Sequence, residues 1–330
     1  MELTVEQSQR REAFIERMRS LGLIGEPGQS HNRKERPPEP PYLVHWAEVS
    51  PLFQEAGEVL KLDDVFRRHV GGYQIVMPGE RAPAHRHSAN AMRFVVYGNG
   101  TAYTVTNGEQ MFMEPGDLLV QPTWGWHDHG NEGDELVAWR DFLDTHIVMA
   151  LQPEFRENWD DGDVQPITHP EGTYSRLGLF QPGHARRAQP AAVPIVYKWG
   201  DASRALKLLA AGGEDDPFDG CLMEYRNPMS GGATVPTLSA RLHLLRPGQE
   251  TQAHRHTSTV RHVVVQGSGV TTVDLTDPAE LRWSKNDAFT VPTWRWHRHR
   301  NSSKTDPAII FSVTDQPAYE ALGFYREETR

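Results

Sequence analysis

The sequence contains very little cysteine: Cys221 is the single one among 330 residues. A lone cysteine excludes a disulfide within the chain and is typical of proteins from reducing compartments. The sequence also lacks an apolar run long enough to span a membrane, and its charged first residues, MELTVEQSQRREAF, lack the apolar core of a signal peptide. We therefore expect a cytoplasmic protein that does not bind membranes.

Positive charge is also scarce. Lysine and arginine together number 34, against 44 aspartate and glutamate residues, which gives a formal net charge of -10. General nucleic-acid binding depends on clustered positive charge, so this balance argues against a nucleic-acid partner. The length of 330 residues and the hydrophobic content of 38% instead suit a globular chain with room for two domains.

What the sequence does contain is one histidine pattern, written twice. Each copy opens with a Pro-Gly pair, continues with the letters AHRH and closes with PTWGWHDH or PTWRWHRH and an asparagine. In the first copy these letters hold His85, His87, His127 and His129; in the second they hold His254, His256, His297 and His299. A regular internal repeat of this kind predicts two domains of the same fold.

Short strand-like runs separated by turn residues fill each copy. Asn107-Gly108 suits the two-residue turn of a hairpin between residues 103–106 and 111–113. Pro-Gly and Gly-Asn-Gly turns bound the neighbouring runs, and the second copy repeats the arrangement. Many short strands with turns at this spacing are typical of a small antiparallel barrel or jelly roll. The predicted fold class is therefore all-β, with two tandem barrels.

Other segments are predicted from composition and periodicity. Apolar residues recur at helical spacing near the start of the chain, which predicts an amphipathic helix over 4–22: Phe14, Ile15, Met18, Leu21 and Leu23. Residues 25–41 are rich in proline, glycine and charge and predict an extended arm. We expect the helix and arm over 1–50, the first barrel over 51–150, a connector over 151–235, with a helix turn at 206–211, and the second barrel over 236–330.

The spacing of the histidines allows them to converge. Residues i and i+2 of a strand point to the same face, so His85 and His87 project together, as do His127 and His129. If the first pair faces the barrel interior, His127 on a facing strand completes a set of three imidazoles. Three protein nitrogens suit iron, zinc, copper or nickel and leave coordination positions open, as a catalytic metal requires. The alternative is that these histidines only pack or lie exposed.

This double pattern resembles the cupin superfamily in its two-barrel, or bicupin, form. The two cupin motifs are matched, in the first copy, at Gly79, His85, His87, Gly98, Gly116, Pro122, His127 and Asn131. The usual glutamate of the first motif is Ala91 here and Val260 in the second copy, which argues against oxalate-degrading and quercetin-cleaving cupins. The stretches AHRHSANAMRFVVYGNG and PGDLLVQPTWGWHDHGN resemble the gentisate 1,2-dioxygenase group, which includes salicylate and 1-hydroxy-2-naphthoate dioxygenases.

The resemblance implies a metal, a co-substrate and a set of site residues. His85, His87 and His127 would hold Fe(II), and O2 would be the co-substrate. The substrate would chelate the iron through adjacent carboxylate and hydroxyl groups before the ring opens between the carbons that carry them. The implied catalytic and substrate-binding residues are Arg93, His129, Asp141, Gln74 and Gly72. The resemblance also implies a homotetramer.

Arg93 has a physical argument of its own. It follows His87 by six residues, so on an unbroken strand it would share the inward face. A guanidinium there can hold a carboxylate by paired, charge-assisted hydrogen bonds. In the second copy His262 takes its place, so that copy keeps possible metal ligands, His254, His256 and His297, without the carboxylate clamp.

We therefore expect an Fe(II)-dependent ring-cleaving dioxygenase, with gentisate as the first choice of substrate. Another 5-substituted salicylate (halo-, amino- or nitro-) is the alternative substrate, and a non-catalytic bicupin that binds a small acid is the alternative class. The family has a further pocket arginine upstream of its HxH pair, for which Arg67 and Arg68 are candidates. Val70 stands where some relatives have a bulkier pocket residue, so ring preference can differ.

Overall fold

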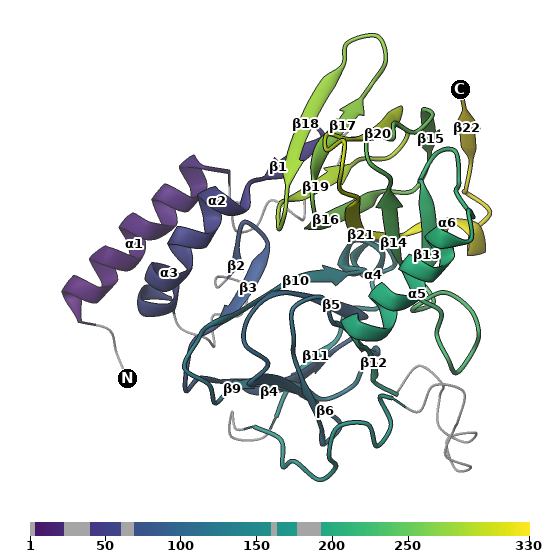
Figure 1. Cartoon of the computed structure of the whole chain (residues 1–330). Coiled ribbons are helices and arrows are strands. Elements are labelled where there is room, and N and C mark those ends of the chain that lie inside the picture. Colours follow the sequence, from purple (N-terminus) through teal and green to yellow (C-terminus); the bar gives the residue numbers. More distant parts are fainter. Residues whose placement is uncertain (1–3, 23–39, 61–68, 160–163, 177–192) are drawn as a thin grey trace. The chain divides into compact units, whose positions relative to one another are not determined.

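A computed structural model of the chain describes residues 4–22, 40–60, 69–159, 164–176 and 193–330. The chain divides into two compact units, Met1–Glu35 with Ala47–Lys198, and Arg36–Trp46 with Trp199–Arg330. Each unit is built mainly from antiparallel strands, which appear as arrows in Figure 1. The predicted fold class, all-β with two tandem cupin barrels, is confirmed.

The first unit contains two antiparallel sheets that enclose one apolar core. The six-stranded sheet has the order β12 (Ile195–Tyr197), β8 (Leu118–Gln121), β5 (Ala91–Tyr97), β10 (Val137–Leu143), β3 (Tyr73–Val76) and β2 (His69–Val70). The five-stranded sheet has the order β11 (Arg156–Asn158), β4 (Arg81–His87), β9 (His127–Asn131), β6 (Ala102–Thr106) and β7 (Glu109–Phe112). Both sheets contribute to the core, for example Val95 and Trp139 from one and Met111 from the other.

The second unit repeats this arrangement. Its six-stranded sheet has the order β1 (Tyr42–Val44), β19 (Ala288–Val291), β16 (Val260–Gln266), β21 (Ala308–Thr314), β14 (Ser239–Leu245) and β13 (Cys221–Glu224). Its five-stranded sheet has the order β18 (Ala279–Ser284), β17 (Ser268–Val273), β20 (His297–Asn301), β15 (His254–His256) and β22 (Glu327–Thr329). Phe289 and Ile310 from the first sheet pack with Trp283 from the second.

The predicted hairpin forms at Asn107-Gly108. Thr106 pairs with Glu109 across the turn, so the loop has two residues. Both turn residues have positive φ, 49° at Asn107 and 82° at Gly108, which is the backbone that asparagine and glycine tolerate best. The turn therefore sets the register of β6, which lies next to the histidine strand β9.

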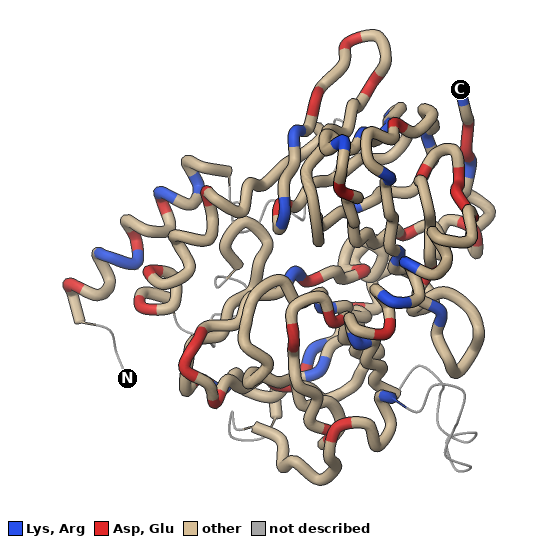
Figure 2. Tube along the Cα trace, viewed as in Figure 1, with Lys and Arg blue, Asp and Glu red and all other residues tan. Residues whose placement is uncertain are grey.

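The described helices are short apart from two. They are α1 (Val5–Ser20), α2 (Trp46–Val49), the 3-10 helix η2 (Ser50–Leu52), α3 (Phe53–Val59), α4 (Thr145–Leu151), α5 (Trp199–Ala211) and α6 (Gln316–Ala321). In α1, the predicted N-terminal helix, Phe14 and Met18 are buried, whereas Leu21, the residue after its last turn, is 56% exposed. Figure 2 shows acidic and basic residues distributed along the rest of α1. No helix of the described segments is long and apolar enough to cross a membrane.

The segment 151–235, predicted as a connector, supplies elements to both barrels. Its β11 pairs with β4 and its β12 pairs with β8 in the first unit, while its β13 pairs with β14 in the second. Such strands satisfy sheet edges that would otherwise present unpaired backbone groups. The predicted helix turn at 206–211 is the end of the longer α5, which buries one face through Ala202, Leu206 and Ala210. The predicted arm falls almost entirely outside the described residues.

Candidate active site

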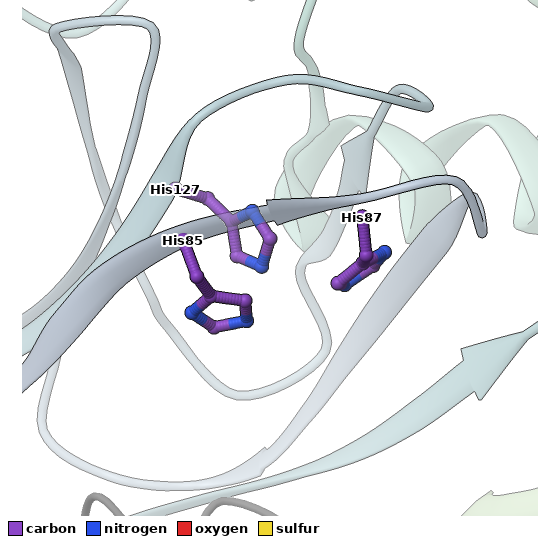
Figure 3. Close-up of side chains that lie close together, drawn as sticks. All are labelled: His85, His87 and His127. Carbon is purple, nitrogen blue, oxygen red and sulfur yellow. The ribbon is translucent and has the colours of Figure 1, made fainter. Parts of the chain in front are cut away.

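Three histidine side chains converge in the first unit. His85 and His87 lie in the last part of β4, and His127 begins β9, directly opposite His85 in the register. The strand that carries His127 is therefore the hydrogen-bonded neighbour of β4 rather than a strand facing it. One ligand nitrogen from each ring lies within 4.8 Å of the other two. Figure 3 shows the three rings gathered around a common point.

The hydrogen bonds behind these rings favour one tautomer. Nδ1 of each histidine faces a backbone carbonyl oxygen: Pro83 for His85 at 3.2 Å, Ala89 for His87 at 2.9 Å and Gly125 for His127 at 3.0 Å. A carbonyl can only accept, so Nδ1 of His85 and of His87 carries the proton and donates, and Nε2 keeps its lone pair for a metal. Nδ1 of His127 also lies 2.5 Å from Nε2 of Gln121. Nε2 of His127 is buried and has no hydrogen-bond partner among the described residues. An orphaned nitrogen of this kind fits a metal ligand.

The electrostatics keep the three rings neutral. Burial lowers the pKa of His85 to about 4 and lowers the pKa of His127 well below its usual value of 6.5. Burial also lowers the pKa of His87. Neutral imidazole is the form that binds a metal ion, and three such donors suit iron, zinc, copper or nickel. The geometry and the donor set therefore fit one divalent transition-metal ion.

Arg93 lies beside the histidines, although not for the reason predicted. Ser88–Asn90 separate the end of β4 from β5, so Arg93 is not on the same unbroken strand as His87; it lies in β5 of the other sheet. It is 4% exposed. Burial is the main cause of the lowered pKa of His87, and the charge of Arg93 is the next. Arg93 therefore approaches the histidines from the six-stranded sheet, not from the sheet that contains β4.

Asp141 is the acidic partner of Arg93. The two residues are paired in the register of β10 and β5, and Oδ1 of Asp141 lies 3.5 Å from Nε of Arg93. Trp139 Nε1 donates to Oδ1 of Asp141 at 3.1 Å, and His69 Nε2 lies 3.2 Å from its Oδ2. Burial alone would raise the pKa of Asp141, but the hydrogen bond from His69 and the charge of Arg93 outweigh it and lower the pKa. Asp141 is therefore an ionised, fixed carboxylate.

His129 and Gln74 are also buried near this cluster. His129 follows His127 by two residues on β9, and its Nδ1 lies 2.9 Å from Thr104 Oγ1. Burial lowers the pKa of His129 well below its usual value, so its ring is neutral. Gln74, on β3, is 4% exposed and is paired in the register with Trp139. Both side chains are held in the barrel that contains the three histidines.

Gly72 has a backbone explanation that needs no substrate. It lies in the turn between β2 and β3 with φ of 84°. A Cβ added there would lie 2.7 Å from Nη1 of Arg140. The positive φ of the turn therefore favours glycine at this position, and a Cβ there would also require the Arg140 guanidinium to shift.

Two residues near the site were missed by the sequence analysis. Gln121, on β8, accepts a hydrogen bond from Arg93 Nη1 at 2.7 Å, and its amide group also contacts Nδ1 of His127. His69, on β2, contacts Asp141. His69 belongs to no motif, and Gln121 lies within the second motif at a position to which the sequence analysis gave no role; pairing across strands brings both to the cluster. The two candidates for the upstream pocket arginine, Arg67 and Arg68, lie outside the described residues. Val70, the position where some relatives have a bulkier residue, is fully buried.

The Arg93–Asp141 pair gives a first testable prediction. We expect Asp141→Asn to lower the free energy of unfolding by about 1–3 kcal/mol, because a buried guanidinium loses its anionic partner. The pKa of Asp141 is lowered in the folded chain, so its stabilisation is present above the usual value of 3.8 and is lost as the pH falls through the folded-state pKa. Urea unfolding at pH 7 measures the difference. Glu157→Gln, which removes an exposed pair with Arg86, is the control and should cost at most about 1 kcal/mol; an equal cost for both variants would contradict the prediction.

Comparisons with known proteins all indicate one family. A family model described as "Cupin domain" matches residues 72–146 and 241–314. The 5-aminosalicylate 1,2-dioxygenase of a Comamonas species is 37% identical over 310 residues, which cover 87% of this chain and 81% of that protein. Gentisate 1,2 dioxygenase 1 of Aquipseudomonas alcaligenes is 37% identical over 258 residues, 78% of this chain and 72% of that protein. The crystal structure of a salicylate 1,2-dioxygenase from Pseudaminobacter salicylatoxidans matches with a TM-score of 0.76 and 27% identity, covering 100% of this chain and 99% of that one.

Proposed function

The chain belongs to the family of bicupin gentisate and salicylate 1,2-dioxygenases, and we propose that it is an Fe(II)-dependent ring-cleaving dioxygenase acting on a salicylate-type acid, with gentisate as the first choice. The observation that carries the proposal is the convergence of His85, His87 and His127, with a buried guanidinium, Arg93, beside them. A metal centre next to a fixed positive charge suits an anionic substrate that chelates the metal.

The three histidines would hold Fe(II) through Nε2, because Nδ1 of each ring is committed to a carbonyl oxygen. When bound, iron would supply open coordination positions for a chelating hydroxy acid and O2, together with redox chemistry for oxidation of the aromatic ring. Three ligands rather than four are what an open site requires.

Arg93 would bind the substrate carboxylate. A guanidinium offers two parallel N–H donors to a carboxylate, and Nε of Arg93 makes no hydrogen bond among the described residues. Asp141 Oδ1 lies 3.5 Å from this Nε, and Gln121 accepts from Nη1, so both residues fix the guanidinium. We propose that Asp141 acts through Arg93, orienting it and balancing its charge before the substrate arrives.

His129 would exchange a proton with the substrate hydroxyl. Its ring is neutral and is held at Nδ1 by Thr104, which leaves Nε2 for the exchange. Gln74, buried on β3, would hydrogen-bond the substrate or bound oxygen, and we assign Gly72 to shaping the entrance turn beside it. The family resemblance implies these roles, and each can be tested by substitution.

Another 5-substituted salicylate remains the alternative substrate, and the 5-aminosalicylate 1,2-dioxygenase among the relatives favours 5-aminosalicylate within that class. Gentisate itself carries a 5-hydroxyl, so the two candidates differ only in one ring substituent. We also propose that the enzyme is cytoplasmic and forms a homotetramer, as the resemblance implies. Light scattering on the purified chain tests the oligomeric state directly.

The decisive experiment measures oxygen uptake by the Fe(II)-loaded protein with a panel of acids. We expect uptake with gentisate, salicylate or the 5-amino, 5-halo or 5-nitro salicylates, and none with benzoate or phenol, because each of these lacks one of the two chelating groups. The fastest member of the panel identifies the substrate. If no 2-hydroxybenzoate supports uptake, the dioxygenase proposal fails and a non-catalytic bicupin that binds a small acid takes its place.

A further inference from the structure

The second unit contains its own histidine cluster, inside a cavity of about 180 Å³. His254 and His256 lie on β15 and His297 begins β20, with His254 opposite His297 in the register. Their ligand nitrogens lie within 4.8 Å of one another, and all three residues are buried. The cluster therefore reproduces the convergence of His85, His87 and His127.

The rings of this second cluster are also oriented with Nε2 available. Nδ1 of His256 donates to the carbonyl oxygen of Ser258 at 2.8 Å, and Nδ1 of His297 donates to that of Arg295 at 3.0 Å. Nδ1 of His254 is held instead by the carboxylate of Glu327, whose Oε1 lies 3.2 Å away. Nε2 of His254 is buried without a hydrogen-bond partner among the described residues, and that residue is 3% exposed. A buried orphan nitrogen aimed into a cavity indicates a missing ligand.

The charge around the second cluster is opposite to that around the first. In the first unit Arg93 and Arg156 act electrostatically on His87, and Asp141 partly offsets them. In the second unit the carboxylates of Asp219 and Glu327 act on the equivalent His256. The charged residues that line the cavity are three carboxylates, Asp216, Asp219 and Glu327, and one guanidinium, Arg241. Arg241 is already paired with Glu224 at 3.0 Å.

The residue paired with the second histidine of each HxH pair accounts for much of this reversal of charge. The strand beside each HxH pair places Arg156 opposite His87 in the first unit and Glu327 opposite His256 in the second. At the position of Arg93 in β5, the second unit has His262 in β16, and Ser312 stands opposite it where Asp141 stands opposite Arg93. His262 stacks on Phe289, with ring centroids 4.3 Å apart. The second cavity therefore has no equivalent of the carboxylate clamp among its lining residues.

We propose that the second cavity is a divalent-metal site, with His254, His256 and His297 as ligands, whose carboxylate surroundings stabilise the ion and exclude anionic aromatic acids. Two net negative charges from the lining residues balance the two positive charges of the ion, so an acid gains little attraction there and meets repulsion from Asp219 and Glu327. Glu327 is a positioning residue: it orients His254 and strengthens it as a donor, as carboxylates behind metal-bound histidines do.

Metal content tests the site without any measurement of turnover. The full chain is stripped with a chelator, loaded with Co(II) and analysed by mass spectrometry. We expect about two ions per chain in the wild type, and about one in His127→Ala or in His254→Ala. We expect none in the variant with both substitutions, since each one disables one of the two sets of three ligands. A folded His127→Ala protein that binds no Co(II), or a double variant that still binds one ion, would overturn the second site.

The role of Glu327 is tested in the His127→Ala background, where the second ion is observed alone. Glu327→Gln should weaken Co(II) binding by about 10–100-fold, the usual cost of losing the partner of a ligating histidine. Glu328→Gln is the matched control, because Glu328 is the next residue of β22 and pairs with Arg255 at the surface. The Glu327 side chain is 40% exposed, so this change should leave the fold intact. Equal affinity in both variants would refute the positioning role.

The exclusion of acids is read from the Co(II) absorption bands. Adding salicylate should leave the bands of the His127→Ala protein unchanged, whereas the bands of His254→Ala should shift. A shift in His127→Ala would refute the exclusion. Unchanged bands in His254→Ala would count against the proposed function of the first unit and would leave the second site as it stands, so the two failures are distinguishable.

Discussion

We expect His127→Ala to abolish oxygen uptake by the Fe(II)-loaded protein. The two nitrogens that remain, on His85 and His87, both come from β4, so the ion loses its only ligand from β9 and with it the three-sided geometry. Removing even the hydrogen-bond partner of a metal ligand costs about 10–100-fold, so loss of a ligand should cost more than about 100-fold in turnover. Oxygen uptake and iron content, measured on the same preparation, check this result.

The internal duplication supplies the matched control. His297 occupies in β20 the position that His127 occupies in β9, so His297→Ala makes the same chemical change in the other barrel. We expect His297→Ala, and likewise His254→Ala or His256→Ala, to retain far more turnover than the first-unit variants, because His262 cannot bind a carboxylate as Arg93 can. Equal loss from both barrels, in variants that are folded and assembled, would contradict the assignment of catalysis to the first unit.

The convergence of the three histidines could be predicted in part from the sequence because the spacing within each pair is local. The i, i+2 spacing of His85 and His87 fixes their common face on a strand whatever the rest of the chain does. The spacing alone did not determine which strand His127 would join, and it lies beside β4 rather than across the barrel. The all-β class was predictable for the same reason, since the Asn107-Gly108 turn and its flanking strands are local signals.

The partners of Arg93 were harder to predict. Continuous counting from His87 suggested a shared strand, but the chain turns at Ser88–Asn90 and Arg93 enters from the opposite sheet. Gln121 and His69 reach the cluster only through strand pairing, which depends on register between segments far apart in the sequence. Neither His69 nor Gln121, which precedes the motif residue Pro122, carries a sequence signal of that pairing. The family resemblance indicated Asp141, whereas its contact with His69 required the structure.

The short strands within 151–235 could likewise not be predicted from the sequence. β11 and β12 have three residues each and pair with strands of the first unit, while β13 pairs within the second. Strands this short have little periodicity of their own, so their sequence resembles a loop. What selects them is the open edge of a sheet that is already formed. The charge reversal between Arg156 and Glu327 became visible only once these edge strands were paired with the two HxH strands.

Arg93→Ala should lose mainly the interaction with the substrate carboxylate. A charge-assisted hydrogen bond is worth about 1.5–3 kcal/mol, which corresponds to about ten- to hundredfold in affinity. Arg93→Lys should recover only part of this loss, because an ammonium group cannot reproduce the planar fork that meets both carboxylate oxygens. The iron should stay bound in both variants, since Arg93 is not a ligand and the three histidines keep their carbonyl partners.

The measurement is oxygen uptake as a function of acid concentration for the wild type, Arg93→Ala and Arg93→Lys, with iron content determined for each. A rise in KM across gentisate, salicylate and the 5-substituted salicylates alike identifies Arg93 with the carboxylate that all of them share. A loss confined to one ring substituent would assign Arg93 to that substituent instead. Unchanged KM in Arg93→Ala would remove the clamp from the mechanism, because a carboxylate bound only by the metal gains nothing from the guanidinium.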